Sequence, residues 1–148
     1  MEKVYLDTSV FSAYFDSRDS VRQKTTQDFW HRLEAYEKYA SELVLDELGK
    51  MGNEAIRKNV LKLTEGFGVL RVTDDVKKLA WKYVEKSVFP NKYFSDALHL
   101  ALATIARINI VISWNFEHFV KRKTRILANT VNLELKYGQV EIIAPPEL

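Results

Sequence analysis

The sequence predicts an α/β fold in which a short, mostly parallel sheet lies between two layers of helices. Two observations lead to this prediction. Strand-like and helix-like segments alternate along the chain, and the strand-like segments have the apolar density of buried strands, as in Val4-Tyr5-Leu6 and in residues 108–113. A strand that is buried on both faces needs that density, whereas a half-exposed strand alternates apolar and polar residues. Right-handed crossovers then bring the carboxyl ends of the strands to one edge of the sheet.

The composition is that of an ordinary globular protein. With 148 residues, 47% hydrophobic and 28% charged, the chain can bury a core and is expected to form one domain, residues 1–148. The absence of cysteine excludes disulfides, a thiol nucleophile and thiolate metal sites, and it fits a cytoplasmic protein. Polar residues interrupt the longest apolar stretch, residues 97–113, so no membrane span is expected, and the start of the sequence gives no reason to expect a leader peptide.

The first half of the chain is expected to contain two strands and four helices. The first strand ends at Asp7-Thr8-Ser9, a run of residues that cap helices well. Phe29, Leu33 and Tyr36 follow one another at spacings of four and three, as on one face of a helix. The expected elements are a strand at residues 3–6, helices at about 10–15 and 25–36, a strand at 39–41, a helix at 43–50 and a helix that begins at Asn53.

The second half is expected to contain three strands and three helices. The spacing of Ile126, Thr130, Leu133 and Tyr137 predicts the last helix, with Gly138 as its stop. The expected elements are a strand at residues 69–72, a helix capped by Thr73-Asp74, a helix at about 95–106, a strand within 108–113, a helix at 123–137 and a strand at 140–143.

Four polar side chains are expected at the carboxyl edge of the sheet. Asp7 and Asn115 each follow a predicted strand, while Glu47 and Asp96 lie in helices whose early turns face this edge. Ligands of open α/β sheets bind at this edge. Carboxylates that are distant in sequence but close in space suit a hard cation such as Mg²⁺, because it takes oxygen ligands. The sequence thus indicates a divalent-cation site.

Three of these residues also have a structural interpretation. Asp7 could cap the following helix, but Thr8 and Ser9 can cap it as well, which favours a functional acid. Asp96 stands in the first turn of a helix, where the dipole favours an acid. That helix is apolar nearly all round, however, and a carboxylate in such surroundings usually has a partner or a cation. Asn115 could cap a short helical turn.

Glu47 has an acidic neighbour, Asp46. The two cannot aim at one ion, because successive helical residues point about 100° apart. Glu47 flanks Val44 and Leu48 on the buried side of the helix, so Asp46 is expected on the surface. His99 is interpreted as a packing residue, and no histidine has the companions that a zinc site needs.

A basic cluster and one aromatic residue are candidates for nucleic-acid contacts. Lys121, Arg122 and Lys123 follow the last site residue and could bind phosphates, although they also suit a solvated helix start. Trp114 could stack on an unpaired base, although tryptophan is as often a core residue.

Four motifs occur in order along the chain: residues 4–9 (VYLDTS), 41–48 (SELVLDEL), 96–101 (DALHLA) and 112–115 (ISWN), the last followed by His118-Phe119. Together they resemble the PIN domain family, and in particular the small VapC-like toxins of type II toxin–antitoxin pairs. Asp7, Glu47 and Asp96 match the acidic positions of that family. Asn115 stands where the commonest form of the family has another Asp. The resemblance covers essentially the whole chain.

The resemblance implies a Mg²⁺- or Mn²⁺-dependent endoribonuclease that hydrolyses RNA phosphodiester bonds and leaves 5′-phosphate and 3′-hydroxyl ends. It also implies a toxin that a small antitoxin neutralises, and commonly a homodimer. The resemblance implies that Asp7, Glu47 and Asp96 bind the cation and that Asn115 contributes to the site. It also implies that Ser113 and Thr8 orient these side chains by hydrogen bonds.

Three alternatives remain open at this point. One is a catalytically weak or inactive module that binds RNA or protein, since Asn115 lacks the charge of an Asp. Another is a phosphohydrolase that forms an aspartyl-phosphate on Asp7, but such enzymes usually have a second Asp where Ser9 stands. The last is a nuclease for structured DNA, which would need insertions to grip a duplex.

Overall fold

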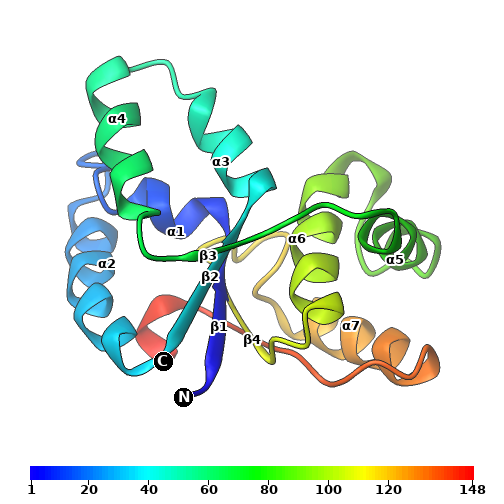
Figure 1. The fold of residues 1–148 in the computed structure, drawn as a ribbon. Helices are drawn as coiled ribbons and strands as arrows, with labels where there is room; N and C mark the ends of the chain where they lie inside the picture. Colours follow the sequence, from blue (N-terminus) through cyan, green and yellow to red (C-terminus); the bar gives the residue numbers. More distant parts are fainter.

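Five short strands form one sheet in the computed structural model, which describes residues 1–148 (Figure 1). All neighbouring strands are parallel, in the order β3-β2-β1-β4-β5. The predicted α/β/α class is confirmed, and the sheet is parallel throughout. The strands are β1 (Lys3–Leu6), β2 (Glu37–Ser41), β3 (Gly68–Leu70), β4 (Ile110–Ile112) and β5 (Glu141–Ile143).

Seven helices cover the sheet. Figure 1 shows α1 and α2 on one side and α5, α6 and α7 on the other, while α3 and α4 form a hairpin beyond the carboxyl end of β2. The last turn of the chain packs against α2, where the Arg32 guanidinium donates to the carbonyl of Pro145 at 3.1 Å. The helices are α1 (Thr8–Ala13), α2 (Ser20–Arg32), α3 (Glu42–Gly49), α4 (Glu54–Leu63), α5 (Asp74–Glu85), α6 (Phe94–Ile105) and α7 (Arg122–Glu134).

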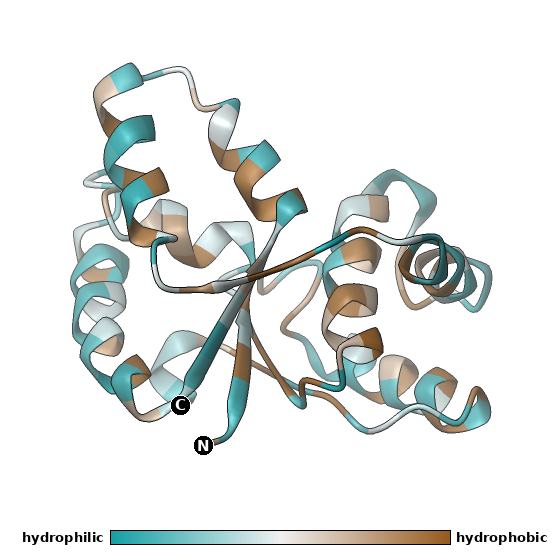
Figure 2. Cartoon of the chain, viewed as in Figure 1, coloured by the Kyte–Doolittle hydropathy of each residue, from teal (hydrophilic) through white to brown (hydrophobic).

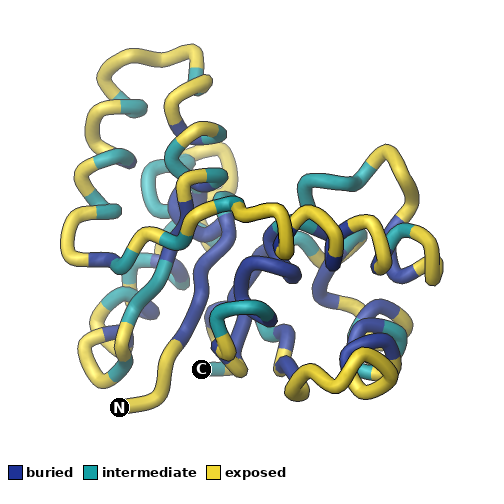
Figure 3. The backbone as a smooth tube through the Cα atoms, turned by 45° about the vertical axis from the view of Figure 1, so that its right-hand side comes forward, coloured by how far each residue is buried: buried dark blue, intermediate teal, exposed yellow.

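The core is centred on β1 and α6. Val4, Tyr5 and Leu6 of β1 are completely buried, because strands flank β1 on both edges and helices cover both of its faces. Figure 2 shows α6 as largely hydrophobic, and Figure 3 shows it buried along most of its length. No helix is long and apolar enough to span a membrane.

Two helices differ from the sequence prediction. The helix expected to begin near residue 25 starts at Ser20, because the Asp19 carboxylate accepts the N–H of Arg22 and caps it. On α7 the predicted spacing does mark a helix, but Ile126 and Leu133 are exposed. The buried side of α7 consists of Thr124, Ala128, Val131 and Asn132.

Candidate active site

Asp7 directly follows β1 and keeps only 4% of its surface exposed. Its Oδ1 accepts the N–H of Ser9 at 3.1 Å and the Ser9 hydroxyl at 2.5 Å, and its Oδ2 accepts the Ser113 hydroxyl at 2.5 Å. The first of these bonds makes Asp7 the N-cap of α1. Of the three residues that could cap this helix, Asp7-Thr8-Ser9, the structure therefore uses Asp7. Burial raises the pKa of Asp7, since the ionised form loses hydration, and the bonds from Ser113 and Ser9 oppose this rise.

Glu47 faces the same edge from α3. Its Oε1 accepts the Thr8 hydroxyl at 2.7 Å and lies 2.7 Å from Nε2 of His99, and its Oε2 accepts the Ser95 hydroxyl at 3.0 Å. Burial raises the pKa of Glu47, but these bonds outweigh burial and bring the pKa to about 2. Asp46 is exposed as predicted, and its carboxylate lies 3.2 Å from the Lys50 ammonium.

A buried chain of hydrogen bonds holds His99 against Glu47. Nδ1 of His99 lies 2.7 Å from the Tyr5 hydroxyl, which in turn lies 2.9 Å from the hydroxyl of Ser41. Nε2 donates to the carboxylate of Glu47 in either protonation state of the ring, because a carboxylate with a pKa of about 2 can only accept. His99 is thus a buried, satisfied residue as predicted, but it also fixes the orientation of a candidate acid.

Asp96 lies in the first turn of α6, as predicted, with 15% of its side chain exposed. Its pKa is raised to about 6, chiefly by burial, and the negative charges of Asp7 and Glu47 add to the rise. The ionised form of Asp96 is therefore disfavoured both by burial and by the two neighbouring acids. Oδ2 of Asp96 also lies 3.4 Å from Nδ1 of His118.

Asn115 caps the turn that follows β4. Its Oδ1 accepts the N–H of His118 at 3.0 Å, and its Nδ2 lies 3.2 Å from Nδ1 of the same histidine. The N–H of Asn115 donates to the Ser113 hydroxyl at 3.0 Å. His118 stacks on Tyr93 with a ring separation of 3.5 Å and contacts Asp96. Asn115 therefore contacts His118 and Ser113, which in turn contact Asp96 and Asp7.

The acids do not form a ready-made metal cage. No group of three or more acidic or histidine side chains is placed to hold an ion. Hydroxyl and imidazole groups occupy the oxygens of Asp7 and Glu47, and the His118 ring lies beside Asp96. The donor set nevertheless fits a hard divalent cation, because it consists of carboxylate oxygens that repel one another.

The candidate nucleic-acid contacts differ in their exposure to solvent. Lys121, Arg122 and Lys123 are exposed at the start of α7, and two of them line a hollow of about 530 Å³ with residues 87–91. Trp114, in contrast, is 8% exposed and lies in the core, where its Nε1–H donates to the Thr26 hydroxyl at 2.9 Å.

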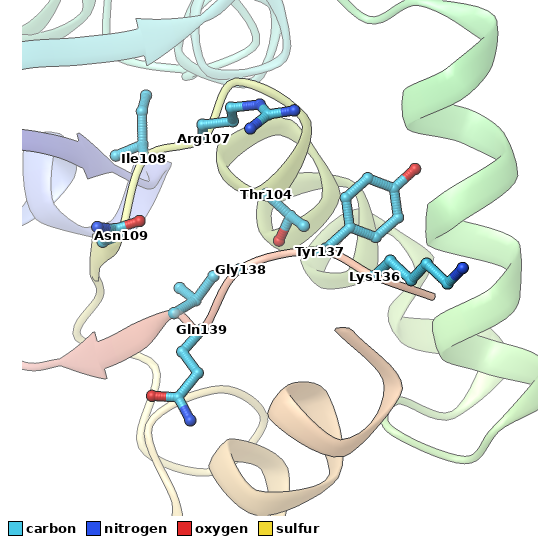
Figure 4. A pocket seen from close by; sticks show the side chains of 9 residues that line it. Thr104, Arg107, Ile108, Asn109, Lys136, Tyr137, Gly138 and Gln139 are labelled. Carbon is cyan, nitrogen blue, oxygen red and sulfur yellow. The ribbon is translucent and has the colours of Figure 1, made fainter. Parts of the chain in front are cut away.

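Two further hollows lie near the ends of the strands. One of about 560 Å³ lies beside Ser9 and Asn115. Another, of about 190 Å³, lies at the opposite edge of the sheet between residues 107–109 and 136–140 (Figure 4). None of the candidate site residues lines the hollow in Figure 4.

Five residues join the site without having been assigned to it from the sequence: Tyr5, Ser9, Ser95, His99 and His118. Only short-range signals for them exist in the sequence. Tyr5, Ser9 and His99 occur within the four motifs, His118 closely follows the last of them, and Ser95 directly precedes the third motif. The partnership of Tyr5 and His99 spans 94 positions and has no local signal.

Several solved structures have a fold similar to that of this chain. VapC20 from Mycobacterium tuberculosis, a toxin that cleaves the sarcin–ricin loop, is 19% identical with a TM-score of 0.59, over 78% of this chain and 92% of its own. FitAcB from Neisseria gonorrhoeae is 14% identical with a TM-score of 0.64, over 98% of this chain and 99% of its own. VapBC-5 from M. tuberculosis, a member of a toxin–antitoxin family, is 19% identical with a TM-score of 0.56, over 97% and 99% of the two chains.

At these identities the likeness is one of fold. No curated protein matches the sequence. The model of the PIN domain family, however, matches residues 4–123, which include all four motifs and all three candidate acids. The chain belongs to the PIN domain family.

Proposed function

We propose that the protein is an endoribonuclease that depends on a divalent cation, Mg²⁺ or Mn²⁺. The observation that supports this most strongly is that Glu47 accepts hydrogen bonds from Thr8, which follows Asp7, and from Ser95, which precedes Asp96, so that the three acids lie at one edge of the sheet. A fold does not gain stability from three neighbouring carboxylates in a partly buried site. A bound cation would remove their repulsion, and PIN domain nucleases generally use such ions.

In this proposal the chain supplies ligands and orientation. Asp7, Glu47 and Asp96 hold the cation, while Ser113 and Thr8 fix the carboxylates of the first two. When bound, the cation lowers the pKa of a water and neutralises charge that develops on the phosphate during in-line attack. No side-chain nucleophile is required, which suits a chain without cysteine.

The basic cluster at the start of α7 supports RNA as the substrate. Lys121, Arg122 and Lys123 lie where the positive end of the helix dipole disfavours cations, so they do not stabilise α7. Contact with RNA phosphates would explain their position. By family resemblance, the target is a single-stranded or loop RNA.

The protein is further proposed to be the toxin of a toxin–antitoxin pair. VapBC-5, which shares the fold over nearly the whole chain, belongs to such a system. An antitoxin segment that covers the carboxylate edge would block access of RNA to the acids. A homodimer is proposed on the same resemblance.

The decisive experiment is cleavage of a mixed RNA pool with Mg²⁺, Mn²⁺ or EDTA by the parent protein and by Asp7→Asn. Asn caps helices as well as Asp, so the variant is expected to fold and to lose activity at least a hundredfold. Asp46→Asn is the matched control, because Asp46 is exposed and outside the site, and it is expected to cleave normally. Cleavage by Asp7→Asn at the parent's rate would show that the site is misassigned.

A second candidate function is a module that binds RNA or protein without cleaving. The observation that favours it is Asn115, whose amide oxygen already caps a turn and which contributes no charge to the acids. A folded protein, free of antitoxin, that binds RNA and cleaves it with none of the cations would support this function over the nuclease.

A further inference from the structure

The hollow beside Ser9 and Asn115 combines features that an unpaired RNA base requires. Phe116 lies at this hollow with 48% of its surface exposed, although it is flanked by buried Trp114. The Arg22 guanidinium lies 4.9 Å from the centre of the Trp114 ring and 5.8 Å from that of Phe116. A large aromatic ring half in water contributes little to the core. It is, however, a surface on which a base can stack.

Arg22 already lies against the aromatic rings of this hollow in the absence of a ligand. Its guanidinium rests on the indole of Trp114, and the nearest carboxylate, that of Asp19, is 3.9 Å away, a loose ion pair. The Trp114 ring is itself fixed by its bond to Thr26 and packs edge-on against Phe116 at 5.9 Å. A planar guanidinium and a planar ring that already lie together present flat faces to a flat ligand.

The charges around the hollow favour a base over a phosphate. Asp16 and Glu117 also line it. Asp16 is paired with Arg18 through bonds of 2.9 and 2.8 Å, and these bonds lower its pKa to about 2, so it stays ionised. A phosphate would meet two carboxylates here and one cation, Arg22. The amino groups on the edges of adenine, cytosine and guanine would instead find acceptors.

The hollow is also next to the candidate reaction centre. Ser9, which lines it, donates its hydroxyl to Asp7 at 2.5 Å and accepts the N–H of Trp114 at 2.9 Å. We propose that this hollow is a subsite for one unpaired base of the RNA, next to the scissile phosphate, in which Phe116 stacks on the base and Arg22 contacts it. This inference rests on the proposed ribonuclease function and specifies how that site would select single-stranded RNA.

The experiment measures binding separately from cleavage. Single-stranded RNA oligomers that carry the fluorescent base 2-aminopurine at successive positions are titrated with the Asp7→Asn protein in EDTA, so that the RNA stays intact. The proposal expects one position whose fluorescence is quenched by stacking. Adding Phe116→Ala is expected to abolish that quenching and weaken binding roughly 5- to 150-fold, the range of about 1–3 kcal/mol per stacked base.

Three further variants test whether the effect of Phe116→Ala is due to stacking on the base. Phe116→Trp retains an aromatic face and is expected to preserve quenching. Arg22→Lys keeps the charge but not the planar group, and is expected to weaken binding several-fold. Leu133→Ala removes another exposed apolar side chain, at 76% exposure on α7, and is expected to change nothing.

The possible outcomes test the base subsite and the proposed nuclease activity separately. If the parent protein cleaves RNA but Phe116→Ala binds and quenches like Leu133→Ala, the subsite is wrong and the nuclease stands. If Phe116→Ala weakens self-association or antitoxin binding and leaves RNA binding intact, Phe116 belongs to a protein interface and the subsite is wrong. If the protein neither binds nor cleaves RNA, both proposals fail.

Discussion

At the scale of single residues, the three candidate acids differ in how their charge is stabilised. Glu47 has donors on both oxygens and a pKa of about 2, so it stays ionised at every physiological pH. Asp96 accepts no hydrogen bond from a side chain, and its pKa is raised to about 6 by burial and by the charges of Asp7 and Glu47, against the opposing charges of His99 and His118. Asp96 is therefore the acid whose negative charge the fold stabilises less than that of Glu47, and a bound cation would stabilise this charge most.

Asp96→Asn is expected to stabilise the fold at neutral pH. The folded protein holds a proton on Asp96 up to about pH 6, whereas the unfolded chain releases it near the ordinary pKa of 3.8. Stability therefore falls as the pH rises from about 4 to 6, and the full penalty, at most about 3 kcal/mol, applies above pH 6. Urea unfolding at pH 7.5 should show the variant to be more stable, with the difference vanishing near pH 4. Equal stability at both pH values would mean that the ionised Asp96 is not strained.

Asn115→Asp is expected to tighten Mg²⁺ binding several-fold. Asp caps a turn as well as Asn, so the bond to the N–H of His118 can survive the change. The substitution adds a negative charge beside the acids, which strengthens the attraction to a cation. Calorimetric titration with Mg²⁺ measures the effect. An unchanged affinity would exclude position 115 from the surroundings of the metal.

Residue roles could be predicted from sequence where local geometry decides them. The choice of Glu47 over Asp46 follows from helical spacing alone, and the structure places Asp46 on the surface. The role of His99 could not be predicted, because its partners Tyr5 and Glu47 come from other elements. The burial of Trp114 likewise depends on Thr26 of α2, which is 88 positions away.

At the scale of elements, the basic residues of α7 lie at its N-terminal end, where the helix dipole disfavours positive charge. Replacing Lys121, Arg122 and Lys123 together with Gln is expected to lower the slope of log affinity against log salt by about 2, since each phosphate contact with single-stranded RNA contributes about 0.7. The fold should not weaken, because these cations oppose the helix dipole. RNA binding measured at several salt concentrations gives the slope.

The control for this experiment lies at the opposite edge of the sheet. Lys3 begins β1, and Arg107 and Lys136 line the hollow of Figure 4. Replacing these three with Gln removes the same charge far from the acids and is expected to leave the slope nearly unchanged. Equal reductions in both triple variants would point to net charge rather than a local contact.

Element prediction succeeded where caps and apolar periodicity agree, as at Asn53 and Thr73, whose side chains cap α4 and α5. It was less complete for α7. The apolar positions Ile126 and Leu133 have helical spacing but face outward, because the buried side of α7 is built from smaller and polar residues such as Ala128 and Asn132. Asn132 is accommodated there because Tyr83 of α5 donates to its Oδ1 at 2.6 Å. Periodicity finds a helix, but tertiary partners decide which face is buried.

At the scale of the whole molecule, strand order is what brings the acids together. β1 lies at the centre of the sheet, between β2 and β4, so Asp7 is flanked by the segments that follow both neighbours. Glu47 follows β2, and Ser113 follows β4 directly. The sequence predicted that strand ends share an edge, but not the order of the strands. We propose that residues 1–148 behave as one domain, since the 36 buried apolar residues form a single core.

Cation binding should consequently stabilise the entire fold in one step. An ion that binds only the folded state at about one hundred times its dissociation constant adds about 2.7 kcal/mol, which raises the melting temperature of a domain this size by several degrees. Calorimetry with Mg²⁺ or Mn²⁺ is expected to show a single transition that shifts upward with cation concentration. Asp46→Asn should respond like the parent, whereas Asp7→Asn and Asp96→Asn should respond much less, because each removes one charged ligand. A shift of equal size in all four proteins would place the bound ion elsewhere, and two separate transitions would contradict a single domain.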